Sequence, residues 1–201
     1  PFDRYLEGDR AALSDAQVRG MALFYGKARC ATCHSGPLLT DQGFHALGLP
    51  AFGPGRTRRF DPYARDVGRM AESDRLEDAY RFRTPALRNV ALTPPYGHNG
   101  AWPTLEGIVR QHLDPEGARA AWRPDMADLP EAPWLAPTDF VIRQDRLEMA
   151  RQARALDIRP VGLSDAEIDD IVAFLHALTG ESAARRPLGR PDSVPSGLTV
   201  D

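Results

Sequence analysis

Cys30 and Cys33 are the only two cysteines of the chain, and His34 follows them directly. This Cys-x-x-Cys-His spacing allows two thiols to add to the two vinyl groups of one haem, while the adjacent imidazole binds the haem iron. We therefore predict a covalent haem c held by Cys30, Cys33 and His34. An iron-binding histidine needs a fixed acceptor for its second ring N–H, and we expect a backbone carbonyl near Pro37 in this role.

Two other kinds of site also use a cysteine pair. A zinc ribbon needs a second pair, which this sequence lacks. A thioredoxin-like motif lies between a strand and a helix, whereas this motif follows a predicted helix and runs into Ser35, Gly36 and Pro37, which break one. A structural cysteine pair in a binding module without haem stays open, and a colourless mature protein would support it.

The composition fits one sizeable domain. The chain has 201 residues, of which 42% are apolar, and a formal net charge of −3, so no polyanion such as a nucleic acid is implied as a partner. No apolar run approaches the roughly 20 residues that span a bilayer. The chain begins at Pro1 rather than at a methionine. Because haem c is attached outside the cytoplasm, we expect a removed export signal and a periplasmic location.

Helix signals enclose the motif and recur towards the end of the chain. Ser14 with Gln17, and Ser164 with Glu167, form capping boxes that predict one helix ending at Gly26 and another with Gly180 at its C′ position. Apolar spacing predicts two further helices over residues 104–112 and 140–155.

The segments between these helices have little periodicity. Residues 35–85 and 114–137 are expected to be irregular, and a loop as long as the first is unusual in a compact domain unless it wraps a ligand. Residues 181–201 predict an extended or disordered tail. We therefore expect an all-α, cytochrome c-like haem domain over 13–180, with long irregular loops around the haem, crossing first and last helices and minor strand content.

The second iron ligand decides the chemistry, because an open iron face binds peroxide whereas a closed face transfers electrons. The residues alone leave several side chains as candidates for this position. These are the tyrosines and Met70, Met126, Met149, His45, His98, His112 and His176.

Three separated stretches resemble one protein family. Residues 82–100 read FRTPALRNVALTPPYGHNG, residues 20–24 read GMALF and residues 171–175 read IVAFL. They are similar to segments of the bacterial di-haem cytochrome c peroxidases and the MauG-like di-haem enzymes, in the family order. The resemblance covers roughly residues 2–180 and implies the C-terminal, electron-transfer half of such proteins. Residues 1–12 then read as a lead-in from an upstream haem domain that this sequence lacks.

The resemblance implies roles for several side chains. The family places a Met or a Tyr as second iron ligand on the helix after the 82–100 segment, and His112 occupies that position, so a haem iron between His34 and His112 is expected; Tyr96 is the main rival. His98 matches a histidine beside the haem that does not bind the iron. Arg83 and Arg88 are candidates to pair with the haem propionates, with a structural or solvated arginine equally open.

The resemblance also implies a calcium ion, bound in part by backbone oxygens of Thr93 and Pro95. No catalytic residue is assigned in this chain. The expected activity is that of a peroxidase: this chain passes electrons from a small cytochrome c or copper protein to a second haem, in an N-terminal domain of the same protein, where peroxide is reduced. The alternatives are a stand-alone mono-haem electron carrier and a MauG-like enzyme that oxidises a partner protein. A homodimer is compatible with the sequence.

Overall fold

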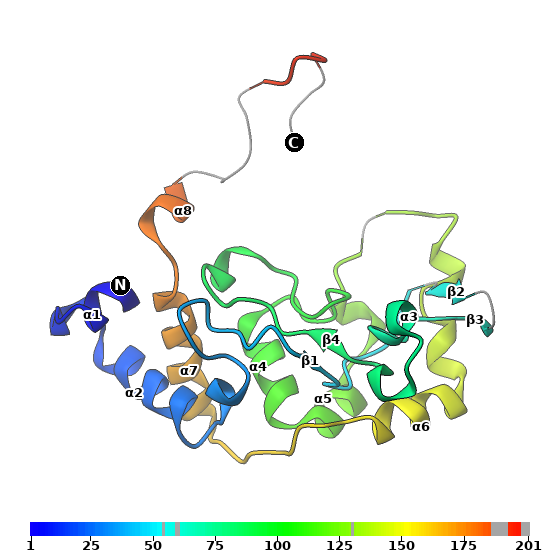
Figure 1. The fold of residues 1–201 in the computed structure, drawn as a ribbon, viewed down its shortest axis with the longest axis horizontal. Coiled ribbons are helices and arrows are strands. Elements are labelled where there is room, and N and C mark those ends of the chain that lie inside the picture. Colours follow the sequence, from blue (N-terminus) through cyan, green and yellow to red (C-terminus); the bar gives the residue numbers. More distant parts are fainter. Residues whose placement is uncertain (54, 59–60, 130, 186–192, 198–201) are drawn as a thin grey trace.

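The computed structural model describes residues 1–53, 55–58, 61–129, 131–185 and 193–197. Over these residues the chain is mostly helical with little sheet, as expected (Figure 1). The helices are α1 (Phe2–Leu6), α2 (Asp15–Tyr25), α3 (Met70–Ser73), α4 (Leu105–Leu113), α5 (Pro115–Ala121), α6 (Arg146–Arg154), α7 (Asp165–Ala177) and α8 (Glu181–Arg185). The strands are β1 (Phe44–His45), β2 (Arg56–Arg58), β3 (Asp61–Arg65) and β4 (Phe82–Arg83).

Helices α2 and α7 both begin at their predicted capping boxes. The Ser14 hydroxyl accepts the Gln17 N–H, and the Gln17 side chain accepts the Ser14 N–H at 2.9 Å. Ser164 and Glu167 repeat the arrangement at the start of α7. Each box satisfies two N–H groups that have no partner within the helix. The capping boxes therefore predicted both helix starts correctly.

The end of α7 differs from the prediction. The helix ends at Ala177 with Leu178 as its C-cap, so Gly180 is not at the C′ position. The reason is a contact from a distant segment. The Asn89 N–H donates to the Leu178 carbonyl at 3.1 Å, and the Asn89 side-chain oxygen accepts the Gly180 N–H at 2.9 Å. Asn89 therefore satisfies two backbone groups just after the end of α7.

Helices α2 and α7 pack directly against each other. A Cβ built on Gly20 would lie 1.8 Å from the carbonyl oxygen of Asp170, so only glycine allows the two backbones to come this close. Arg19 grips the Asp170 carboxylate with two hydrogen bonds of 2.8 Å. Inside the crossing, the ring of Phe174 meets those of Phe2 and Phe24 edge-on at centroid distances of 5.3 Å.

Helix α4 begins after Thr104, as predicted, and runs to Leu113. The prediction that residues 114–137 are irregular was wrong over α5. Asp114 caps the new helix by accepting the Gly117 N–H. Pro115 occupies the first turn, where a backbone N–H has no partner within the helix, so proline loses no hydrogen bond there. The Asp-Pro pair ends one helix and also starts the next.

The helix predicted over 140–155 was too long. Only Arg146–Arg154 is α-helical, and a separate 3₁₀ turn covers Val141–Gln144. Asp145 divides the two because its carboxylate accepts the Glu148 N–H at 2.9 Å and so acts as an N-cap.

The 35–85 segment contains short regular elements that its sequence does not signal. Strand β1 pairs with β4 and β2 pairs with β3, both antiparallel. The predicted extended tail begins instead as the short helix α8, and residues 186–192 and 198–201 of that tail lie outside the described residues. Among the described helices, none combines the length and apolar character that a membrane span needs.

Candidate haem site

The Cys-x-x-Cys-His motif lies directly after α2 (Figure 1). Gly26 is the C-cap of α2, and Arg29, at φ 59°, reverses the chain so that a 3₁₀ turn starts at Cys30. Within this turn the carbonyl oxygen of Cys30 accepts the N–H groups of Cys33 and His34. The motif is therefore a hydrogen-bonded unit attached to the crossing of α2 and α7.

Burial raises the pKa of both thiols, which disfavours the thiolate that disulfide exchange requires. Both cysteines are free and partly buried. Burial raises the pKa of the Cys30 thiol to about 11 and also raises the pKa of the Cys33 thiol. Reactive Cys-x-x-Cys pairs instead have a lowered thiol pKa, since the thiolate is the nucleophile. The environment argues against a dithiol redox centre.

The imidazole of His34 is oriented by a backbone carbonyl, as predicted. Its Nδ1 lies 3.1 Å from the carbonyl oxygen of Leu39, two residues beyond Pro37. A carbonyl only accepts, so Nδ1 carries the proton and Nε2 keeps its lone pair. Leu39 itself is fully buried at φ 55°, an uncommon conformation for leucine. Burial and the nearby His112 lower the pKa of His34 to about 4, which keeps the ring neutral and able to bind a metal.

His112 lies on α4 and faces His34. Its Nδ1 donates to the Ile108 carbonyl one turn earlier, at 2.8 Å, which again leaves Nε2 without the proton. Burial lowers the pKa of His112. The centroids of the two imidazole rings are 6.2 Å apart, and the ring planes are inclined by 59°.

These residues fit an iron ion held from both sides. A bond from a metal ion to an imidazole nitrogen is about 2 Å long, so two imidazoles on opposite sides of one ion have ring centres about 6 Å apart. The observed 6.2 Å agrees with this requirement. Within the described part of the chain, neither Nε2 atom has a hydrogen-bond partner. Both ligands thus have their Nδ1 occupied and their Nε2 available.

The two arginines proposed for the propionates have protein partners. Arg88 donates to the Pro37 carbonyl at 2.8 Å and pairs with Asp3. Arg83 donates to the side chain of Gln42 and to the carbonyl of Thr84, both at 3.3 Å. Arg88 thereby ties α1 to the segment after the motif, which is a structural role.

The remaining residues implied by the family resemblance lie in or beside the loop that follows β4. The ring of His98 stacks on Phe82 at a centroid distance of 3.4 Å, and its Nε2 lies 3.6 Å from the carboxylate of Asp66. Burial lowers the pKa of His98 to about 4. Thr93 and Pro95 lie on the exposed part of the loop, on either side of Pro94.

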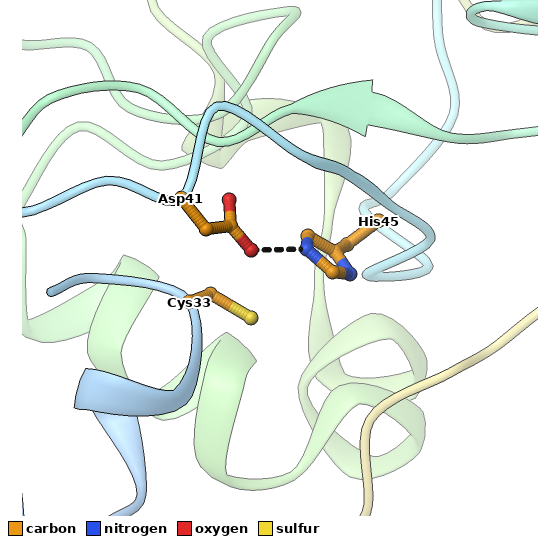
Figure 2. Close-up of side chains that lie close together, drawn as sticks. All are labelled: Cys33, Asp41 and His45. Carbon is orange, nitrogen blue, oxygen red and sulfur yellow. Dashed lines mark hydrogen bonds and ion pairs between the residues drawn. The ribbon is translucent and has the colours of Figure 1, made fainter.

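Sequence reasoning missed a charged cluster beside Cys33. The ligand atoms of Cys33, Asp41 and His45 all lie within 4.8 Å of one another, and Figure 2 shows Asp41 and His45, from one loop, beside Cys33 of the motif. Such a trio is able to hold a metal ion, but Cys33 belongs to the haem motif, so we assign no metal to it. The i, i+4 spacing of Asp41 and His45 was the one signal in the sequence.

A mostly apolar pocket is lined in part by His45 of this cluster, but not by His34 or His112. It lies between the loop after β1 and the loop after β4. Its lining includes His45, Leu49, Arg65, Tyr80, Phe82 and His98.

A mostly helical chain with a Cys-x-x-Cys-His motif and a second imidazole facing the first defines a cytochrome c-type domain. Over 198 residues the chain is 42% identical to the cytochrome-c peroxidase IdrP1 of Pseudomonas sp. (strain SCT), covering 89% of this chain and 44% of that protein. Over 186 residues it is 31% identical to the methylamine utilization protein MauG of Methylorubrum extorquens, covering 92% of this chain and 40% of that protein.

A solved structure supports the same relationship. The crystal structure of a MauG-like protein associated with microbial copper homeostasis matches with a TM-score of 0.62 and 28% identity, covering 90% of this chain and 51% of that one. No family model matches the sequence. The chain belongs to the cytochrome c peroxidase and MauG family, as a partial domain. It spans less than half the length of the curated relatives named above.

Proposed function

We propose that this chain is a haem c electron-transfer domain whose iron is held by His34 and His112. The thiols of Cys30 and Cys33 attach the haem, which supplies an iron centre that gains and loses one electron. The observation that carries the proposal is the pair of facing imidazoles, 6.2 Å apart, with each Nδ1 tied to a backbone carbonyl. We propose that segments within residues 35–85 and 114–137 lie around this haem.

Ligands on both sides suit electron transfer better than peroxide binding. An iron with two strong axial ligands has no free face for peroxide. The backbone contacts of His34 and His112 hold both rings still, so little rearrangement accompanies a change of iron charge. Two histidines also favour a lower potential than a Met/His pair.

The chain would therefore relay electrons within a di-haem peroxidase. Its relatives are cytochrome c peroxidases and MauG, and it covers less than half of each. A small cytochrome c or copper protein would supply electrons, and a second haem in an N-terminal domain would reduce peroxide. We further propose a periplasmic location and a calcium ion on the backbone oxygens of Thr93 and Pro95.

A MauG-like role is the second candidate, in which the protein uses peroxide to oxidise a partner protein. The observation that favours it is the 31% identity to MauG. Turnover assays separate the two roles: a peroxidase consumes peroxide with a small redox protein as the electron donor, whereas a MauG-like enzyme needs its protein substrate.

Low-temperature EPR of the haem-loaded protein tests the ligand pair. The wild type should give a low-spin ferric signal that His112→Ala removes, because a missing axial ligand leaves a high-spin iron. His176→Ala is the matched control, since His176 is an exposed histidine on α7. An unchanged signal in His112→Ala would remove His112 from the site.

A haem count by pyridine haemochrome tests the di-haem proposal. Two haems per polypeptide in the full-length protein agree with a di-haem peroxidase. One haem per polypeptide supports a mono-haem electron carrier, and no haem would end both proposals.

A further inference from the structure

His45 lies between two carboxylates. Its Nε2 is 2.8 Å from Oδ2 of Asp41, and its Nδ1 is 3.8 Å from Oδ2 of Asp157. The three side chains are 30%, 29% and 23% exposed, respectively, so water and protons reach them while bulk solvent screens them only in part. Asp41, His45 and Asp157 form a carboxylate–histidine cluster.

The cluster is held in place by an arginine and by backbone groups. Arg81 pairs with Asp157 at 2.6 Å and also donates to the carbonyl of Phe44. The N–H of Ala46 donates to the other oxygen of Asp157 at 2.9 Å. Strand β1, which contains His45, pairs with β4 next to Arg81. Binding or release of a proton therefore changes the charge of the cluster without needing a large movement.

Among the residues that the structure describes, no arginine pairs with Asp41. Arg81 balances Asp157, and Asp41 has His45 itself as its partner. Burial opposes the charge on Asp41, but the hydrogen bonds from His45 and from the N–H of Gly43 outweigh it and lower the pKa of Asp41 to about 2. Asp41 thus stays ionised, and the local charge is −1 with a neutral His45 and zero with a protonated one.

The cluster lies at the point where the haem would be attached. The sulfur of Cys33 is within 4.8 Å of the ligand atoms of Asp41 and His45 (Figure 2). On the proposed function, this sulfur is bonded to the edge of the haem. An extra negative charge on the haem would then stabilise a positive imidazolium a short distance away.

We infer that His45 takes up one proton when the haem takes up one electron. The electron comes from the one-electron donor, the iron passes from ferric to ferrous, and one proton from solvent binds the neutral imidazole beside Asp41. On reoxidation the electron leaves towards its acceptor and the proton returns to solvent. The inference rests on the proposed function and adds to it a proton-coupled step. By reciprocity, proton binding must then raise the haem potential.

The groups that face His45 come from several segments. They are Asp41 from its own segment, Asp157 from the stretch after α6, Arg81 before β4, and Cys33 from the motif. Imidazole is the side chain that ordinarily titrates between about pH 5 and 8. The chain has 5 histidines: His34 and His112 would be bound to iron, and burial lowers the pKa of His98 to about 4. The two histidines that remain are His45 and the exposed His176.

Potentiometric titration at several pH values tests the inference on the haem-loaded, full-length protein. A fully coupled proton lowers the midpoint potential by about 59 mV per pH unit, the equivalent of tenfold in proton concentration for one electron. The wild type should show a decline between about pH 5 and 8 that approaches this slope over part of the range. His45→Gln should lose that decline, because glutamine keeps a hydrogen bond to Asp41 and binds no proton. The matched control, His176→Gln, should keep it.

The possible results separate the two proposals. Absorption spectra should show that His45→Gln retains the axial ligands of the wild type, so that a change of slope reports the proton and not the iron. If haem is present and low-spin but His45→Gln declines as steeply as the wild type, the inference is wrong and the proposed function stands. A protein without covalent haem overturns both.

Discussion

The two ends of the molecule are held together by different forces (Figure 1). The helical end, formed by α1, α2 and α7, buries apolar side chains such as Phe24 and Phe174, which are 1% and 0% exposed. The polar end, around α6, buries a carboxylate: Glu148 is 1% exposed and accepts a hydrogen bond from Arg65 at 2.6 Å. The first end follows from local sequence signals, whereas the second depends on residues 83 positions apart.

At the polar end, the buried Glu148 carboxylate has hydrogen-bond partners from more than one segment. Besides Arg65, the Glu148 carboxylate receives contacts of 3.5 Å from Arg151 and Gln152 on its own helix. Burial raises the pKa of the nearby Tyr80, and the Glu148 charge raises it further. A buried ion pair contributes little net stability when intact, but breaking it is costly. The two ends should therefore respond differently to single substitutions.

The largest loss of stability is expected at the crossing of the helical end. Gly20→Ala should lower the free energy of unfolding by more than about 3 kcal/mol, because the new methyl group would meet the backbone of α7 at Asp170 and force the helices apart. Denaturant unfolding of the haem-loaded protein measures this. Gly162→Ala is the matched control, since a Cβ there meets nothing within 4 Å. Equal stabilities of the two variants would show that the crossing is not close-packed.

The next loss is expected at the polar end. Glu148→Gln keeps the size of the side chain but removes its charge, and should cost about 3 kcal/mol because it breaks an ion pair whose carboxylate is almost fully buried. The same denaturant assay applies. Glu77→Gln breaks the exposed pair with Arg75 and should leave the unfolding midpoint unchanged. If both variants unfold like the wild type, the buried pair of Glu148 contributes no more to the free energy of unfolding than an exposed pair does.

The difference between the ends also explains which elements the sequence predicted. Capping boxes at Ser14 and Ser164 lie within four residues of the groups they satisfy, so they can be read directly. Apolar spacing likewise marked α4, and the motif predicted haem attachment at Cys30, Cys33 and His34 without any structure. The facing position of His112 needed the family resemblance, because no local pattern links it to His34.

The missed features depend on contacts between distant segments. Asn89 ends α7 from 89 positions away, because its N–H donates to the carbonyl of Leu178. Asp157 likewise reaches His45 from another part of the chain. Neither residue has a neighbour in sequence that reveals its partner. Asp114 and Asp145 were missed as helix starts for a different reason: aspartate is common in turns as well as at N-caps.

The smallest effect is expected at the ring of His98, whose side chain is 21% exposed. Burial lowers the pKa of His98 from its ordinary 6.5 to about 4. Between these values the unfolded chain binds a proton that the folded chain does not, so the free energy of unfolding falls as the pH falls. The side chain is 21% exposed, so the slope should stay well below the about 1.4 kcal/mol per pH unit of a fully buried group. This stability is fully present above about pH 6.5 and is lost as the pH falls towards 4.

Replacing His98 isolates its share of this pH dependence. His98→Gln also loses the stacking on Phe82, so the slope of stability against pH, and not the stability at one pH, is the quantity to compare. The slope between pH 6.5 and 4 should become shallower, because glutamine takes up no proton in either state. His176→Gln should leave the slope unchanged, since that side chain is exposed on α7. An unaltered slope in His98→Gln would mean that the folded structure does not hold the pKa of His98 below its ordinary value.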